Sequence, residues 1–145
     1  MRGASLLSRK RKLGDVMKVS VKSPLKRIGG KHRSAHRIVA AFPEASAYDR
    51  YVEPCGGAAH VLLAKPAYKH EEVFNDLDNN LVAFWQEIKS NHEVMLDHLS
   101  SLPYARSLYY DFYRSLFDGT ELTRFERATR WWLIFQTTRR KLSKQ

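Results

Sequence analysis

The stretch YVEPCGGAAHVLLAKP, from Tyr51 to Pro66, decides the fold that this sequence predicts. A short strand-like piece leads into Pro-Cys, two glycines and two alanines, and an apolar run then continues until Lys65 and Pro66 end it. Small residues between a strand and a helix let the backbone approach a ligand, which meets the free N–H groups at the helix start. Close packing of the helix on the strand would explain the same small residues without a ligand. The stretch therefore predicts a strand–turn–helix unit, but by itself it does not distinguish a ligand site from close packing.

A second strand-like piece, Glu72–Asn75, is followed by an acid. Asp76 lies 19 residues after Gly57. At the end of a second strand, an acid at this spacing can accept hydrogen bonds from both ribose hydroxyls of an adenosine. Asp76 is therefore predicted to bind a ribose, which weakens the explanation by packing alone. The pattern G-x-G-x-x-G is absent, and this disfavours a generic dinucleotide-binding domain.

Apolar spacing and helix-breaking residues divide the rest of the chain mainly into helices. Asp78 is placed to cap a long helix, and TRFE (Thr123–Glu126) is a capping box for the last one. Strands are predicted over 48–53 and 72–75. Helices are predicted over 31–42, 57–65, from 78 onward, 104–117 and 123–140.

The net charge of +10 is unevenly distributed along the 145 residues. Residues 1–40 hold twelve Lys and Arg against one acid, residues 41–100 hold four against ten, and residues 101–145 hold nine against four. Basic ends around an acidic middle favour polyanion-binding surfaces that flank a different kind of site. Residues 1–22 are predicted to be a basic, disordered leader in which Met17 could be the natural start. A solvated tail would explain SRKRK (Ser8–Lys12) without any partner.

Composition excludes several classes of protein. With 43% hydrophobic residues and the length of one domain, the chain is neither disordered overall nor fibrous. No apolar run reaches the length of a membrane span, and the first residues lack the apolar core of a signal peptide. The six histidines show no metal-ligand spacing. The single cysteine, Cys55, rules out an internal disulfide framework and predicts a reducing cytoplasm.

Three blocks carry a family resemblance: PLKRIGGK (Pro24–Lys31), YVEPCGGAAHVLL (Tyr51–Leu63) and VFNDLDNNLVAFW (Val73–Trp85). Together, over residues 23–140, they resemble the N-terminal half of the Dam-like DNA adenine N6-methyltransferases, in particular the branch of phages and mobile elements. The resemblance implies an α/β fold. Residues 23–100 would hold the first two strands of a partial Rossmann-like methyltransferase fold, and 101–145 a helical segment that leads toward target recognition. Double-stranded DNA is the implied partner.

The resemblance also implies S-adenosylmethionine as cofactor. Lys31 would sit beside the carboxylate of its methionine end, and Glu53 would reach its amino group. Asp76 would hold the ribose. The other implied cofactor-binding residues are Arg27, Pro54, Gly56 and Gly57. A side chain at either glycine of the turn is expected to block the approach of the ligand.

Several features depart from the family pattern. Arg27 and Cys55 stand where aromatic residues are usual, and Ala59 replaces the last glycine of the loop. The catalytic tetrapeptide Asp/Asn-Pro-Pro-Tyr/Phe is absent, since no two of the five prolines are adjacent. In the family, its aromatic ring stacks on a flipped adenine while its polar groups accept hydrogen bonds from the adenine amino group. No catalytic residue is therefore assigned, and the chain alone is expected to be inactive.

Two interpretations stay open. The chain is the N-terminal segment of an adenine-specific DNA methyltransferase that a C-terminal segment completes, or a non-catalytic nucleic-acid-binding remnant that uses its basic ends on phosphate. The basic ending QTTRRKLSKQ has no packing pattern and favours a truncated reading frame. Because the strand at 48–53 would keep an open edge, the chain alone is expected to be molten, oligomeric or insoluble.

Overall fold

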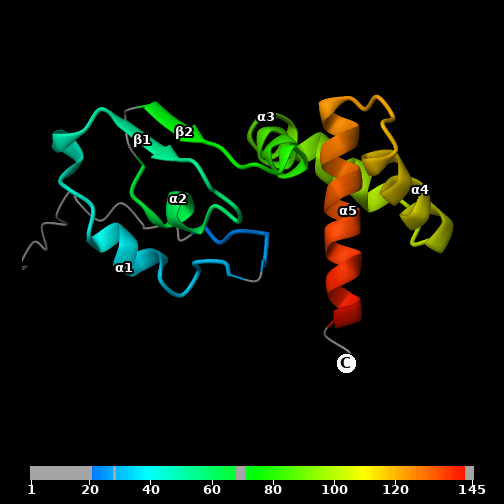
Figure 1. The fold of residues 1–145 in the computed structure, drawn as a ribbon, viewed down its shortest axis with the longest axis horizontal. Helices are drawn as coiled ribbons and strands as arrows, with labels where there is room; N and C mark the ends of the chain where they lie inside the picture. The colour runs from blue at the N-terminus through cyan, green and yellow to red at the C-terminus, as the bar shows by residue number, and fades with distance from the viewer. Residues whose placement is uncertain (1–20, 28, 68–70, 143–145) are drawn as a thin grey trace, which may run out of the picture.

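The computed structural model describes residues 21–27, 29–67 and 71–142, which form two parts (Figure 1). The strand-containing part comprises α1 (Ala35–Ala40), the 3-10 helix η1 (Ala45–Ala47), β1 (Arg50–Glu53), α2 (His60–Ala64) and β2 (Glu71–Phe74). The helical part comprises α3 (Asn79–Ser101), α4 (Arg106–Phe117) and α5 (Arg124–Leu142). Most of the predicted basic leader and the last three residues lie outside the described residues. Among the helices of the described ranges, none combines the length and the apolar character that a membrane span needs.

β1 and β2 pair in parallel, with Tyr51 opposite Glu72 and Glu53 opposite Phe74. The chain between them carries α2, as a parallel pair requires a crossover connection. The prediction that these two strands are present is confirmed, although β1 starts at Arg50, the first residue that pairs with β2. Within the described residues the sheet has these two strands alone. The result is a mixed α/β structure that is compatible with a methyltransferase-like fold.

The helices predicted over 31–42 and 57–65 are both shorter in the structure. α1 starts at Ala35, because the Ser34 hydroxyl donates to the Lys31 carbonyl at 3.3 Å instead of capping the first N–H groups. α2 starts at His60, because Ala59 before it is left-handed at φ +53°. A residue in that conformation cannot belong to a right-handed helix, so the predicted start at Gly57 is wrong.

Both predicted helix caps are confirmed. One Asp78 carboxylate oxygen accepts hydrogen bonds from the N–H groups of Asn80 at 3.1 Å and Leu81 at 3.3 Å. At the start of α5, the Thr123 hydroxyl accepts from the Glu126 N–H at 3.2 Å, and the Glu126 carboxylate accepts from the Thr123 N–H at 3.0 Å. The N–H groups at both helix starts therefore have partners, which fixes where α3 and α5 begin.

One hydrophobic cluster joins the two parts. Phe84 of α3 stacks on Trp132 with ring centroids 5.0 Å apart and lies against Trp131 at 5.6 Å. Leu25 and Ala58 reach this cluster from the strand-containing part. Its remaining buried members are Leu81, Ala83, Met95 and Ala128. Burial of apolar side chains is the main favourable term in folding, so this cluster is the main support of the fold.

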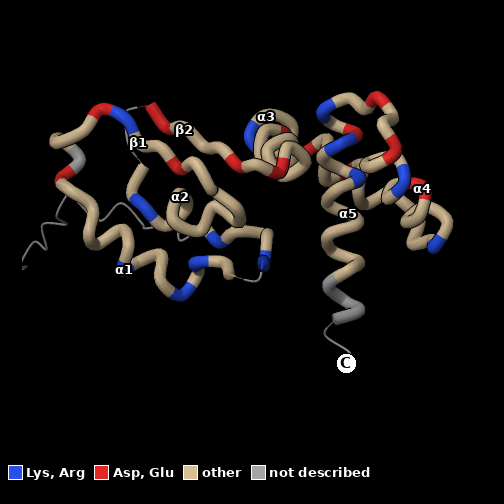
Figure 2. Tube along the Cα trace, in the orientation of Figure 1, with Lys and Arg blue, Asp and Glu red and all other residues tan. Residues whose placement is uncertain are grey.

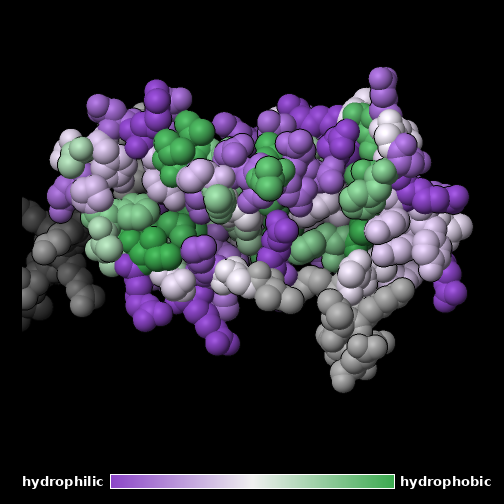
Figure 3. Space-filling view, viewed as in Figure 1, coloured by the Kyte–Doolittle hydropathy of each residue, from purple (hydrophilic) through white to green (hydrophobic). Residues whose placement is uncertain are grey.

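The surface is less uniform than the core. On the face shown in Figure 3, hydrophobic residues form several separate patches among hydrophilic ones. α4 contributes no buried residue, and its Tyr110, Tyr113 and Phe117 are all exposed. On β1, Val52 is 52% exposed. The strands and α4 therefore leave apolar side chains in contact with water.

A buried carboxylate links α3 to α5. Glu87 is 1% exposed. Its carboxylate accepts hydrogen bonds from the Arg124 guanidinium at 2.5 Å and from the side-chain amide of Asn91, where α3 is kinked, at 2.8 Å. Burial alone would raise the pKa of Glu87, but these hydrogen bonds and the Arg124 charge outweigh it and hold the pKa below its ordinary value. Glu87 is therefore a charged group whose burial depends on its partners.

Candidate functional site

A cavity of 280 Å³ lies where β1 and β2 end. Four charged side chains line it: Arg27, Lys31, Glu53 and Asp76. The small or apolar residues around them are Gly29, Gly30, Cys55, Gly56, Gly57, Ala58 and Val61, and His60 completes the lining. Six of the seven residues that the sequence predicts for a cofactor site thus share one cavity, and Pro54 is the exception. Residues up to 49 positions apart in the chain meet there.

Main-chain hydrogen bonds continue the parallel ladder into the loops around this cavity. The Asn75 N–H donates to the Glu53 carbonyl and the Gly56 N–H donates to the Asn75 carbonyl, both at 2.9 Å. The Asn75 side-chain amide donates to the Pro54 carbonyl at 3.4 Å, so Pro54 supports the turn from outside the lining. Both strands bring their carboxyl ends to this edge, which is where open α/β sheets bind ligands.

Asp76 connects the two loops. One of its carboxylate oxygens accepts a hydrogen bond from the Gly57 N–H at 2.9 Å, and the other accepts from the Asp78 N–H at 3.1 Å. A carboxylate offers about four lone-pair sites, so this half-buried group still has capacity for further donors. Asp76 therefore holds the glycine turn in place and can also bind a ligand.

Positions 56 and 57 of the turn favour glycine for different physical reasons. Gly57 has φ +53°, and a Cβ atom added there would meet no atom within 4 Å, so it faces open space. A Cβ atom at Gly56 would instead overlap the ring of Phe74 on β2. The predicted reason for a glycine, the approach of a ligand, is thus compatible with position 57. At position 56 the packing of the protein itself already requires the glycine.

Lys31 and Glu53 place opposite charges in the same cavity. Burial raises the pKa of Glu53, while a hydrogen bond from Tyr51, the Leu62 backbone and the charges of Lys31 and Lys65 oppose that rise. The Tyr51 hydroxyl donates to the Glu53 carboxylate at 3.0 Å. A neighbouring anion and cation of this kind are suited to a zwitterion such as the α-amino-acid end of a small molecule.

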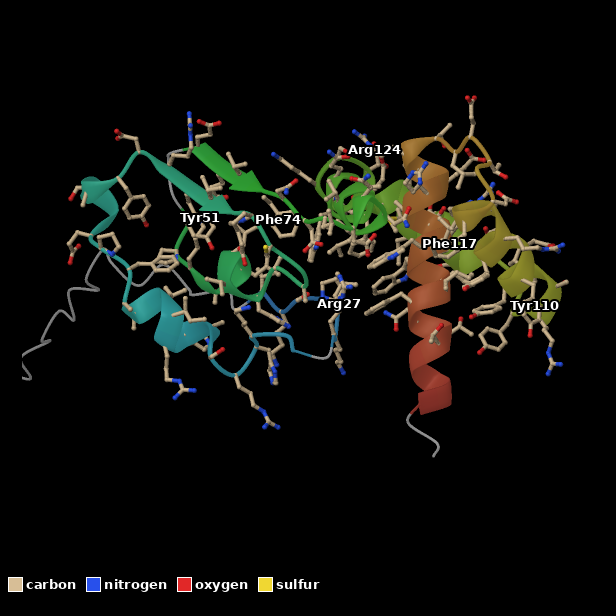
Figure 4. All side chains as sticks on the ribbon, in the orientation of Figure 1. Arg27, Tyr51, Phe74, Tyr110, Phe117 and Arg124 are labelled. Atoms are coloured by element: carbon tan, nitrogen blue, oxygen red, sulfur yellow. The ribbon has the colours of Figure 1, made fainter. Side chains whose placement is uncertain are left out.

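Arg27 lies between the strand-containing part and the helical part (Figure 4). Its guanidinium is 4.0 Å from the Asp78 carboxylate, the same group that caps α3. Both side chains are about one-third exposed. At that distance and exposure the attraction is weak, so Arg27 is free to change partner when a ligand enters.

A second cavity of 540 Å³ adjoins the first and shares Arg27, Gly30 and His60 with it. Among the described residues that line it, none is acidic, and six are Lys, Arg or His: Lys22, Lys26, Arg27, His32, His36 and His60. Figure 2 shows Lys and Arg along α1 and the segment before it. Burial and the neighbouring His32 ring, 5.9 Å away between centroids, lower the pKa of His60.

Sequence reasoning missed several of these residues. The excess of Lys and Arg before residue 40 signalled the basic character of the second cavity, but nothing in the pattern marked His60 as a lining residue or Tyr51 as the partner of Glu53. Within residues 21–27, 29–67 and 71–142, no group of three or more His, Cys, Asp or Glu side chains is arranged to hold a metal ion.

Comparison with protein families gives a match over most of the chain. Residues 28–143, which is most of the chain, match the family described as D12 class N6 adenine-specific DNA methyltransferase. The match spans both strands, the three helices of the helical part and every residue that lines the cavity at the strand ends except Arg27. No curated protein matches the sequence.

Proposed function

The chain belongs to the D12 class of N6 adenine-specific DNA methyltransferases, and from this premise we propose that it binds S-adenosylmethionine in the cavity at the ends of β1 and β2. Methyltransferases of this class generally depend on that cofactor. The observation that carries the proposal is the arrangement of Lys31, Glu53 and Asp76 around one cavity at the carboxyl ends of parallel strands.

The charges of the cavity fit the methionine end of the cofactor. This end carries a carboxylate and an ammonium group on one carbon atom. The ammonium of Lys31 suits the carboxylate, and the carboxylate of Glu53 suits the ammonium. A neutral or singly charged ligand would match at most one of these two protein charges.

The opposite side of the cavity fits the ribose. Asp76 accepts one hydrogen bond from the Gly57 N–H and one from the Asp78 N–H. Its remaining lone pairs can accept hydrogen bonds from the ribose hydroxyls. Gly57 leaves open space beside it. Asp76 would then bind the ribose and hold the turn under it with the same carboxylate.

S-adenosylmethionine, when bound, supplies a methyl group on a positively charged sulfur atom. The residues of this chain bind and orient that molecule. They include no Asp/Asn-Pro-Pro-Tyr/Phe tetrapeptide, whose polar groups would accept hydrogen bonds from the adenine amino group and position its nitrogen. We therefore propose that these 145 residues alone do not methylate DNA, and that activity requires a segment that supplies those groups.

The second cavity supports DNA as the partner. Its basic lining, without an acidic residue among the described ones, would favour phosphate groups next to the cofactor site. The same lining is the observation that favours the second candidate function, a nucleic-acid-binding protein without catalysis.

Calorimetry with S-adenosylmethionine separates the two candidates. We expect the chain to bind the cofactor, and Lys31→Met and Glu53→Gln each to weaken binding by roughly 10- to 100-fold, the scale of a hydrogen bond to a charged group. Lys89→Met, at an exposed position of α3, is the matched control and should change nothing. A folded chain that binds duplex DNA but no cofactor would overturn the proposal in favour of the second candidate.

Methyl transfer is tested separately. The chain is incubated with S-adenosylmethionine carrying a tritiated methyl group and with adenine-rich duplex DNA. No label should reach the DNA above a control without protein. Label above that control would show that the chain contains its own acceptor groups.

A further inference from the structure

Tyr51 is not among the described residues that line the cavity, and its hydroxyl reaches the cavity through Glu53. The two side chains lie on the same face of β1, since alternate residues of a strand point the same way. The Tyr51 hydroxyl donates its single proton to one oxygen of the Glu53 carboxylate at 3.0 Å, and Glu53, but not Tyr51, lines the cavity. Burial and the nearby carboxylates of Glu53 and Glu72 raise the pKa of Tyr51, so its hydroxyl stays protonated and remains a donor.

The Tyr51 ring is held from several sides. The Lys65 ammonium lies 5.0 Å from its centroid, and the Phe42 ring lies 5.7 Å away. Lys65 is 7% exposed and pairs with Glu72, which is also the residue opposite Tyr51 on β2. Segments that follow α1 and α2, together with β2, therefore hold this phenol ring.

A fixed donor has a consequence for the carboxylate it binds. A glutamate side chain has three rotatable bonds and loses about 1.5–2 kcal/mol of rotamer freedom when it is ordered. A hydrogen bond from a ring held by these contacts orders Glu53 before any ligand arrives, which reduces the cost of binding. The ammonium of buried Lys65 lies over the Tyr51 ring and pairs with Glu72, so Lys65 helps to hold Tyr51 in place.

We propose that Tyr51 is a positioning residue that aims the Glu53 carboxylate at the amino group of the cofactor's amino-acid end, with the Lys65–Glu72 pair holding Tyr51 in place. The inference rests on the proposed function. It assigns a role in cofactor recognition to three residues outside the cavity lining. It also predicts that the role concerns one end of the cofactor and not the other.

Two ligands distinguish positioning from a merely structural role. S-adenosylmethionine carries the amino-acid end on a sulfonium, and 5′-methylthioadenosine has the same adenosine with a neutral methylthio group and no amino-acid end, so each variant is compared with the parent chain for each ligand separately. Tyr51→Phe keeps the ring and its contacts and removes only the hydroxyl. We expect it to weaken S-adenosylmethionine binding by roughly 3- to 10-fold, a part of what a hydrogen bond to a charged group is worth, and to leave 5′-methylthioadenosine binding unchanged. Tyr113→Phe on exposed α4 is the matched control.

A double variant tests whether Tyr51 acts through Glu53. If it does, Tyr51→Phe should add little to the loss already caused by Glu53→Gln, because coupled residues are not additive. Thermal unfolding of each variant checks that the fold is kept. Equal weakening of both ligands, or full additivity of the two substitutions, would overturn the positioning role while leaving the cofactor site intact. A parent chain that binds neither ligand would overturn the proposed function and this inference together.

Discussion

The strand-containing part and the helical part are held together by different means. In the helical part, large side chains make the stabilising contacts. Phe84 packs against Trp131 and Trp132, and the buried Glu87 pairs with Arg124. In the strand-containing part, small residues bring main chains close together, and Asp76 ties one loop to the next. The contacts that stabilise the helical part can therefore be changed without touching the candidate site. Around the cavity, the same polar groups stabilise the loops and are available to a ligand.

The largest effect is expected in the aromatic core. Phe84→Ala removes a ring that is 1% exposed and should lower the free energy of unfolding by about 3–5 kcal/mol. Phe117→Ala, on α4 and 66% exposed, should change it by less than about 1 kcal/mol. Urea unfolding followed by circular dichroism measures both. Similar losses for the two variants would mean that the helical part does not depend on this cluster.

The next effect is expected at the ion pair between α3 and α5. Arg124→Ala leaves the Glu87 carboxylate buried with Asn91 alone and should cost about 2–3 kcal/mol, less than a fully buried pair because Arg124 is half-exposed. Arg114→Ala breaks an exposed pair with Asp111 and should cost no more than about 1 kcal/mol. The same unfolding measurement applies. Equal costs would contradict the view that burial makes this pair important.

A third substitution tests the coupling of stability and binding around the cavity. Asp76→Ala should weaken S-adenosylmethionine binding by about 1.5–3 kcal/mol, and the loss of its bond to the Gly57 N–H should also lower the thermal unfolding midpoint. Asp97→Ala, an exposed acid on α3, should affect neither quantity. Calorimetry and thermal unfolding report the two effects. Unchanged affinity in the Asp76 variant would place the ribose elsewhere.

Much of the architecture could be predicted because short-range chemistry fixes it. Asp78 and the Thr123–Glu126 pair cap helices through bonds to N–H groups two or three residues away, so the sequence alone locates them. Two of the three blocks that predicted the cavity, those that hold Glu53 and Asp76, meet there because parallel strands end at one edge.

The remaining features depend on contacts that no local pattern contains. Phe74 requires the glycine at position 56, and Lys65 fixes the ring of Tyr51, only because two strands and the segment after α2 come together. The predicted starts of α1 and α2 were wrong because single residues, Ser34 and Ala59, adopt bonds or backbone angles that residue spacing does not reveal. The expected molten or oligomeric state of the chain stays a prediction, which the unfolding curve of the parent chain tests before any variant is compared with it. A soluble monomer with a cooperative thermal transition would contradict it.

The smallest effect is expected at the left-handed residue of the turn. Ala59 at φ +53° carries a strain of about 1–2 kcal/mol, which a glycine would relieve while losing chain entropy and a buried methyl group. Ala59→Gly should therefore leave the free energy of unfolding unchanged within about 0.5 kcal/mol. Ala58→Gly, without that relief, should lower it by about 1–2 kcal/mol. A larger loss at position 59 than at position 58 would argue against the left-handed turn.

The hydrogen bond from the Trp85 indole to the Gly57 carbonyl, at 3.0 Å, has an optical consequence. Indole emission responds to the polarity and hydrogen bonding around the ring, and Trp85 is one of only three tryptophans in the chain. The other two, Trp131 and Trp132, lie against Phe84 in the helical part. Replacing both with phenylalanine would leave a single fluorophore attached to the glycine turn. Its emission would then report directly on what happens at that turn, without a label and without catalysis.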